Sequence, residues 1–237
     1  MIIKALLKLL LISLFLTPAL GVHKATAADK ASETEKTKAQ VSMPWYTHSQ
    51  NDWAWIQYRD HPETGFVQIK ANLTLNAKLK RVRYLLTDKT AALTWVEGVK
   101  RIVVLEQQQG SRVQLVVLDP IWPVEPREML TSNTIRESDD EFMIEVEDHN
   151  QYLKPNPNRI RVEQVNVTWQ VKQTEDNIVD VQYRGYFQPG GSLPAWLSNE
   201  IFLILISDSL ANLKGVVEGT QVAQSNISDS SKTSPTP

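Results

Sequence analysis

Apolar and polar residues alternate along two stretches in the middle of the chain, 111–118 and 141–148. Alternation over this length predicts strands with one buried face and one wet face, as in antiparallel sheets. Two longer stretches, 158–171 and 177–187, predict a hairpin whose second strand is broken at Pro189-Gly190-Gly191. The apolar faces of the first two strands consist of Val113, Leu115, Val117, Phe142, Ile144 and Val146.

The region before residue 100 predicts two strands followed by two helices. Residues 53–75 form two strands around the turn sequence Pro62-Glu63-Thr64-Gly65. A helix follows in 76–88, where Asn76 can cap the first turn, and a short helix follows in 89–98. The first helix is basic on one side, and that side is either a solvated surface or a contact for anionic headgroups. Its apolar face consists of Leu79, Val82, Leu85 and Leu86, and its basic side of Lys78, Lys80, Arg81 and Arg83.

The last apolar segment, 201–206, is hydrophobic on every side of any helix that it could form. Such a helix is buried or covers something apolar. The order of strands, helices, many strands and one long helix predicts an α+β domain with an antiparallel sheet. A large twisted sheet curls around its apolar face, so we expect the helix at about 193–217 to pack along the concave side. Its expected sheet partners include Val113, Leu115, Ile144, Val165, Val167 and Val181.

The pattern leaves two possibilities for the space between this helix and the sheet. In a tightly curled sheet the helix fills the concavity. In a more open sheet a chamber remains, and an apolar chamber holds an apolar ligand. Composition does not decide between them.

The two ends of the chain differ from the middle. Residues 1–27 have the pattern of a cleaved signal peptide, with an early basic region, an apolar run and the small-residue box Ala25-Thr26-Ala27. We therefore expect an exported protein, and the periplasm fits best. Residues 28–43 predict a disordered lead-in and residues 219–237 a disordered polar tail. The folded domain is expected at 44–218.

Composition narrows the chemistry. The chain has no cysteine, which excludes a thiol nucleophile, a thiolate metal site and a lipoprotein anchor. The net charge is −2, and three of the 25 basic residues fall within 1–27, which argues against nucleic acid as the partner. His48, His61 and His149 are far apart, and neither a serine-hydrolase elbow nor a phosphate-binding glycine loop occurs. We expect no metal and no cofactor.

Two motifs resemble a known family. Trp-Pro-Val-Glu-Pro-Arg-Glu occupies 122–128, and Pro-Gly-Gly-Ser-Leu-Pro-Ala-Trp-Leu-Ser-Asn occupies 189–199. Together they resemble the START (StAR-related lipid transfer) domain family, particularly its bacterial exported members, over most of 50–217. Glu128 stands where the family usually has aspartate. The resemblance implies a helix-grip fold, a curved sheet around a long C-terminal helix. It also implies a lipid-sized tunnel whose mouth is formed by the 118–129 loop and the start of that helix.

Candidate ligand-binding residues lie in these motifs and in the long hairpin. Trp122 can sit in the mouth, dip into a membrane interface or fold back on the core. Arg127 can neutralise a lipid phosphate or pair with a nearby glutamate. Trp169 and Tyr183 each carry one polar atom that can orient a headgroup, and a register slip of one residue would turn both away. The full expected set is Trp122, Arg127, Trp169, Tyr183, Leu193, Trp196, Leu197, Ile201 and Leu205.

The sequence thus predicts an exported, monomeric carrier of a lipid or sterol-like hydrophobic ligand that contacts membranes transiently and is not an enzyme. One alternative is a partner-binding or assembly module whose core is filled by its own side chains. A second is a polyketide cyclase- or hydrolase-like enzyme on the same fold. A cavity of at least ~300 Å³ separates the carrier from the module. Polar acid/base groups inside the cavity separate the enzyme from the carrier.

Overall fold

Antiparallel strand pairing organises most of the chain that the structure describes. The computed structural model describes residues 43–120 and 124–219. Within this part of the chain the strands are β1 (Tyr46–Gln50), β2 (Ala54–Asp60), β3 (Val67–Asn76), β4 (Val99–Gln108), β5 (Ser111–Leu118), β6 (Arg127–Glu137), β7 (Glu141–Asp148), β8 (Ile160–Arg161), β9 (Glu163–Glu175) and β10 (Ile178–Gln188). The helices are α2 (Leu79–Thr87), α3 (Lys89–Ala92) and α4 (Ala195–Glu218).

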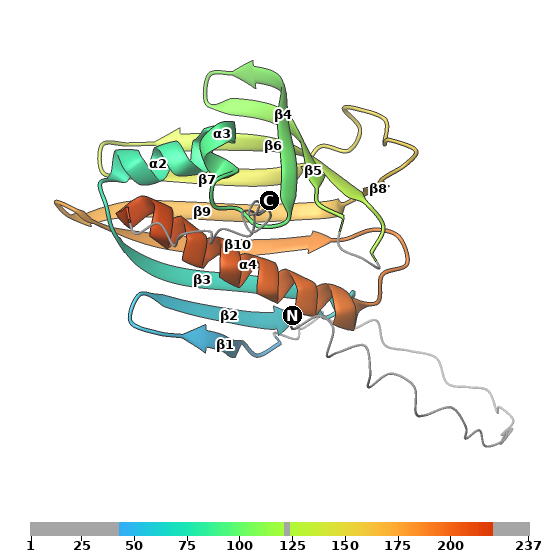
Figure 1. The fold of residues 1–237 in the computed structure, drawn as a ribbon, viewed down its shortest axis with the longest axis horizontal. Coiled ribbons are helices and arrows are strands. Elements are labelled where there is room, and N and C mark those ends of the chain that lie inside the picture. The colour runs from blue at the N-terminus through green and yellow to red at the C-terminus, as the bar shows by residue number, and fades with distance from the viewer. Residues whose placement is uncertain (1–42, 121–123, 220–237) are drawn as a thin grey trace, which may run out of the picture. The chain divides into compact units, whose positions relative to one another are not determined.

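The strands form one sheet in the order β1-β2-β3-β10-β9-β7-β6-β5-β4 (Figure 1). All pairs along this order are antiparallel, while β8 pairs in parallel with the start of β6. The long hairpin predicted from the sequence is β9–β10. The turn predicted at Pro62-Glu63-Thr64-Gly65 joins β2 to β3, and Gly65 has a positive φ of 70° there, which suits glycine.

Helix α4 runs along the concave face of the sheet, as the apolar segment 201–206 predicted (Figure 1). It packs most closely on β3, where Leu210 and Leu213 are fully buried. Ile144 and Val181 belong to the same core, and Val167 packs against it. The fold is therefore the helix-grip fold that the sequence indicated, a large curved antiparallel sheet with a long C-terminal helix. Its core lies between β2, β3, β10, β9, β7 and α4.

The predicted facing of β5 is wrong. Arg112, Gln114 and Val116 line the space between sheet and helix. Because successive side chains in a strand point to opposite faces, Val113 and Leu115 lie on the other side of the sheet. Both faces of β5 carry branched apolar residues, so alternation alone does not determine which face is concave.

Of the two short helices, α2 packs near the C-terminal end of α4, and α3 packs against α2 and β4. Asn76 ends β3 and does not cap α2; the N-cap is Lys78, which makes no side-chain cap. The free Leu79 N–H instead donates to Gln173 Oε1 at 2.7 Å. Helix α3 is shorter than the 89–98 helix that the sequence predicted. Asp88 begins it by accepting hydrogen bonds from the N–H groups of Thr90 and Ala91.

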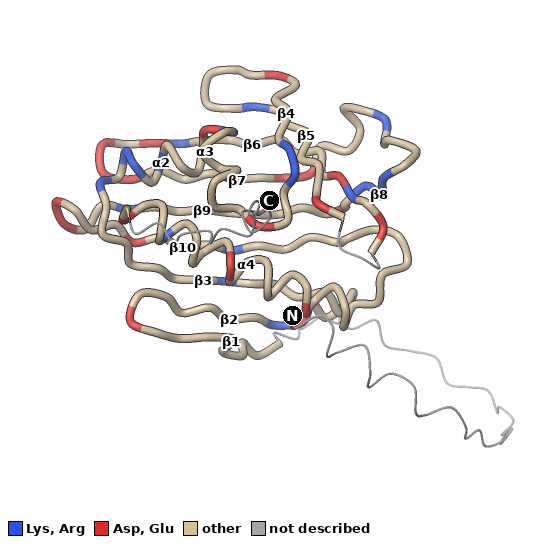
Figure 2. The backbone as a smooth tube through the Cα atoms, viewed as in Figure 1, with Lys and Arg blue, Asp and Glu red and all other residues tan. Residues whose placement is uncertain are grey.

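Charged residues gather at hairpin tips, on α2 and near β8, whereas α4 carries few of them (Figure 2). Even so, no helix in the described ranges combines the length and hydrophobicity needed to cross a bilayer. Within the fold, α4 buries Leu203, Ile206, Leu210 and Leu213.

Candidate ligand cavity

A cavity of about 260 Å³ lies between the concave face of the sheet, α4 and the segment that joins α3 to β4. One wall consists of sheet residues from β4, β5, β6, β7, β9 and β10. The opposite wall consists of Phe202, Leu205, Ile206 and Ser209 of α4, and the connection 95–98 closes one side. Most of the wall is apolar. The volume is slightly below the ~300 Å³ expected from the sequence, but it is several times the ~30 Å³ share of one water molecule.

A group of four polar residues interrupts this apolar wall on β5 and β6. In the antiparallel register Arg112 lies opposite Asn133, and Gln114 lies opposite Thr131. Thr131 Oγ1 donates to Asn133 Oδ1 at 2.9 Å. Among the described residues Gln114 Oε1 and Arg112 Nε have no hydrogen-bond partner although both atoms are buried. A buried polar atom without a partner costs free energy, so this wall favours a ligand that carries a polar group.

Sequence reasoning missed these four residues. The alternation in 111–118 assigned Arg112 and Gln114 to the wet face, and Thr131 and Asn133 were not considered. A signal was nevertheless present in the sequence. Two consecutive strands each carry a pair of polar residues two positions apart, and such pairs fall on one face of each strand.

An aromatic wall stands beside the polar residues. The rings of Trp169 and Tyr183 are 4.6 Å apart, and Trp95 meets Trp169 edge-on at 5.9 Å. All three line the cavity. Trp95 Nε1 donates to Leu85 O at 2.8 Å. Burial raises the pKa of the Tyr183 phenol, so it stays protonated and can donate to a ligand.

Gly185 makes room for the Tyr183 ring. A Cβ added at Gly185 would clash with Tyr183 Oη. Glycine at this position on the concave face of β10 therefore allows the phenol to lie along the strand.

A smaller pocket of about 80 Å³ adjoins the cavity toward the start of α4. It is lined by Leu193 and Ile201 and shares Leu205 with the larger cavity. Phe187 and Phe202, whose rings are 4.3 Å apart, also line both spaces. Leu205, Phe187 and Phe202 therefore lie at the boundary between the two spaces.

Arg127 donates to backbone carbonyl groups and does not form the ion pair with a nearby glutamate that the sequence allowed. Its Nε donates to Pro189 O at 3.0 Å, and a terminal nitrogen donates to Glu125 O at 2.7 Å. No ion pair of Arg127 occurs within residues 43–120 and 124–219. The buried guanidinium holds the chain before α4 to the start of β6, and burial lowers its pKa. A structural role explains these contacts better than a lipid phosphate does.

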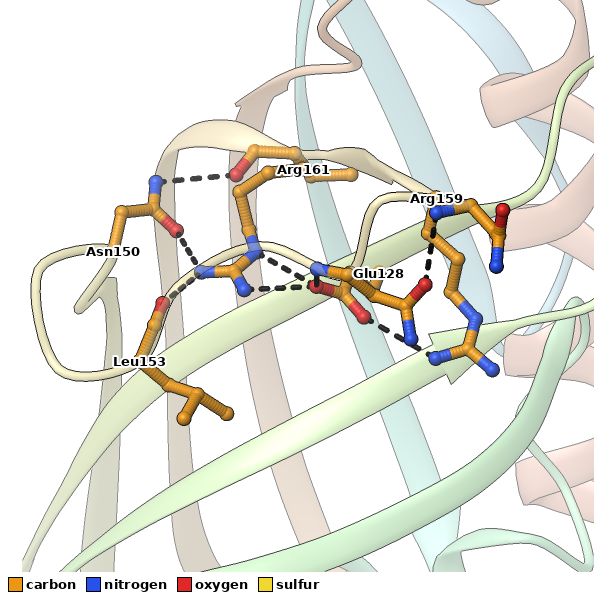
Figure 3. Close-up of polar contacts among 8 residues, drawn as sticks. Glu128, Asn150, Leu153, Arg159 and Arg161 are labelled. Atoms are coloured by element: carbon orange, nitrogen blue, oxygen red, sulfur yellow. Dashed lines mark hydrogen bonds and ion pairs between the residues drawn. The ribbon is translucent and has the colours of Figure 1, made fainter.

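Glu128 is the glutamate that forms a buried ion pair, and its partner comes from β8 (Figure 3). Glu128 Oε1 accepts from Arg161 Nη2 at 2.8 Å and from the Asn156 N–H at 3.0 Å. The other carboxylate oxygen faces Arg159 at 3.4 Å. Arg161 also donates to Asn150 and to Leu153 O. These contacts hold the 149–161 segment to β6.

The expected ligand-binding residues are thus divided by the structure. Trp169, Tyr183 and Leu205 line the large cavity, and Leu193, Ile201 and Arg127 line the small pocket. Trp196 is 60% exposed at the start of α4 and, like Leu197, lines neither space. Trp122 lies outside the described residues.

The fold defines the class of architecture: this chain has the helix-grip architecture of START domains. A STAR-related lipid transfer protein from Xanthomonas axonopodis superposes with a TM-score of 0.66 at 21% identity, covering 73% of this chain and 98% of that one. Human StAR-related lipid transfer protein 5 superposes with the same TM-score of 0.66 at 12% identity, covering 78% of this chain and 89% of that one. At these identities the likeness shows the fold.

Sequence comparison adds one relative. An uncharacterized protein of Pseudomonas aeruginosa is 22% identical over 145 residues, which cover 61% of this chain and 72% of that protein. No protein-family model matches the chain. The fold assigned from the two sequence motifs is confirmed by the structural neighbours, and the ligand-binding roles of individual residues stay predictions.

Proposed function

We propose that this protein binds a lipid or another hydrophobic ligand in its internal cavity and carries or presents it in the cell envelope. The main supporting observation is a largely apolar cavity of about 260 Å³ that has α4 as one wall and a compact polar patch on the opposite wall. An apolar chamber with a few converging polar groups is the usual form of a small-molecule site. The lipid transfer proteins that share the fold make a lipid the natural ligand class.

The cavity also bears on the assembly-module alternative. Protein interiors are packed so closely that voids larger than a water molecule are few. A continuous space of about 260 Å³ therefore supports a ligand site over a core that has been filled by its own side chains. Because the free volume is small, we propose a ligand with one slim apolar body.

The ionisable lining residues favour binding over catalysis. Among the described residues that line the cavity, the ionisable ones are Glu97, Arg112 and Tyr183. Glu97 accepts a hydrogen bond from Asn212 at 2.6 Å, and the phenol of Tyr183 is held protonated by its raised pKa. An acid/base mechanism needs groups poised to exchange protons near the working pH, so we propose a non-catalytic carrier.

Export, transient membrane contact and a monomeric state complete the proposal. Export rests on the signal-peptide pattern of residues 1–27. Trp196, exposed at the start of α4, is suited to a membrane interface.

Native mass spectrometry of the protein purified from its own source tests this function. A bound hydrophobic ligand of defined mass is expected. Val116→Phe, which adds bulk to the cavity wall, should lower ligand occupancy severalfold. Val113→Phe, on the opposite face of the same strand, is the matched control and should keep the ligand. If the folded protein carries no ligand, or if both variants keep it equally, the proposal fails.

A further inference from the structure

Arg112 places a positive charge in the cavity wall without a carboxylate in contact. One terminal nitrogen of its guanidinium donates to Thr87 O at the end of α2, while Nε is buried and has no partner within the described residues. The ion pairs of the described residues do not include Arg112. A buried charge is normally paired, so this arginine has unused capacity for an anion.

Asp88 is the nearby negative charge, and its effect on Arg112 is limited. Its Oδ1 atom accepts from the N–H groups of Thr90 and Ala91 and so caps α3. Burial lowers the pKa of Arg112, and the attraction of Asp88 offsets this only in part. The charge of the Arg112 side chain, which also helps to hold α2, is therefore incompletely neutralised.

Asn133 supplies a second donor beside Arg112. The two residues are cross-strand partners on β5 and β6, and side chains in such positions lie about 4.5–5.5 Å apart at Cβ. Since Asn133 Oδ1 accepts from Thr131, the amide of Asn133 is oriented with its nitrogen free to donate. An anionic oxygen group could receive hydrogen bonds from both residues.

We infer that Arg112, assisted by Asn133, binds the anionic head of a single-chain amphiphile, either a carboxylate or a phosphate monoester, while its apolar chain occupies the rest of the cavity. This inference rests on the proposed function and names the ligand class. The apolar wall near the polar group, including Val116, Val167 and Trp169, provides the surface for the chain. Arginine matches both anions because its planar fork donates two hydrogen bonds at once.

The test compares three probes of equal chain length on the purified full chain. Tetradecanol, tetradecanoate and tetradecyl phosphate are titrated below their micelle-forming concentrations. The fluorescence of the cavity tryptophans Trp95 and Trp169 and isothermal titration calorimetry report binding. At least one anion should bind about tenfold tighter than the alcohol or more, which is the scale of one charged hydrogen bond. The preferred anion then identifies the head group.

Arg112→Gln should reduce this preference to about twofold or less. The matched control is Arg101→Gln, which removes the same charge from an exposed position on the neighbouring strand β4 and should keep the preference. Arg112→Lys, which keeps the charge but loses the planar fork, should keep part of it. Since Arg112 also contacts α2, thermal unfolding of each variant is measured in parallel; the comparison of probes on the unaltered protein does not depend on any variant.

Equal binding of the alcohol and both anions would overturn the inference and leave the proposed carrier function in place. A folded Arg112→Gln variant that keeps the full preference would overturn the inference in the same way. Failure of all three probes to bind would overturn the inference, and native mass spectrometry of the purified protein would then decide separately whether the proposed function holds.

Discussion

The buried carboxylate of Glu128 should dominate the stability of the segment that crosses from β7 to β9. Glu128 is 1% exposed and its partner Arg161 is 7% exposed, and their closest approach is 2.8 Å. Glu128→Gln keeps the shape of the side chain but leaves the Arg161 charge buried and uncompensated. Breaking one side of a buried pair costs about 3–5 kcal/mol, so a loss of that size is expected in the free energy of unfolding.

The matched control is Glu137→Gln. Glu137 pairs with Arg83 at 2.7 Å, but both side chains are about half exposed. Exposed pairs contribute about 0–1 kcal/mol. Urea unfolding at pH 7, followed by circular dichroism, should therefore separate the two variants clearly. Replacing Glu128 by Gln and Arg161 by Met together should recover part of the loss, because no unpaired charge remains.

The pH dependence gives an independent check. Burial by itself would raise the pKa of the Glu128 carboxyl, but hydrogen bonds from Asn156 and Arg161, together with the Arg161 charge, bring the pKa below its ordinary value. A depressed folded pKa means that the unfolded state binds the proton more readily. The stability contributed by the ionised Glu128 carboxylate is therefore complete above the ordinary pKa of about 4.3. It is lost as the pH falls through the pKa of Glu128 in the folded state.

The stability difference between the unaltered protein and Glu128→Gln should accordingly be largest near neutral pH and shrink under acid conditions. A Glu128→Gln variant that loses no more than the Glu137→Gln control would refute the reasoning. So would a stability difference that stays constant from pH 7 to below the folded pKa. Neither residue lines the ligand cavity, so the variants that fold should keep their ligand affinity.

Two further predictions concern glycines. Gly185→Ala should displace the Tyr183 ring by overpacking, which should lower ligand affinity and cost about 1–3 kcal/mol of stability. Adding Tyr183→Leu to this variant should recover stability in thermal unfolding. The double variant should still lack the hydrogen bond from Tyr183 to the ligand. Gly190→Ala should cost more stability than Gly219→Ala: both have a positive φ, of 70° and 72°, but an added Cβ would clash with a β8 backbone oxygen only at Gly190. If urea unfolding gives equal losses of stability for the two variants, the clash at Gly190 is relieved without cost and the reasoning is wrong.

The sequence predicted two kinds of element well: strands in which one face is clearly the more apolar, and a helix that is apolar on every side. In β7, Phe142 and Ile144 share one face while Glu141, Met143 and Glu145 lie on the other, and both Phe142 and Ile144 are buried in the structure. The long α4 helix was also predictable, because 201–206 is apolar on all sides and the Pro-Gly-Gly break fixes where the preceding strand ends.

The errors have a common physical cause. Pairing between distant segments decided the facing of β5 and the choice of ion-pair partner, and the local sequence pattern contains neither. In β5 the register is set by pairing with β4 and β6, and the β4–β5 ladder contains two irregularities. Arg127 and Glu128 are adjacent basic and acidic residues, and the sequence does not reveal that β8 comes from 33 residues away to pair with Glu128. Partners from distant segments determine which of the two charges forms the ion pair.

The position of the cavity follows from how α4 distributes its large side chains. Toward its C-terminal end Leu210 and Leu213 are fully buried in the core that includes β3. Ser209, the small residue directly before Leu210, faces the cavity, and its hydroxyl accepts from the Glu97 N–H at 2.8 Å and donates to Leu205 O at 2.7 Å. A small side chain that is already hydrogen-bonded cannot reach the polar wall on β5 and β6. The helix therefore closes the cavity without filling it, which is the property that a ligand carrier requires and that hydropathy along 201–206 alone did not reveal.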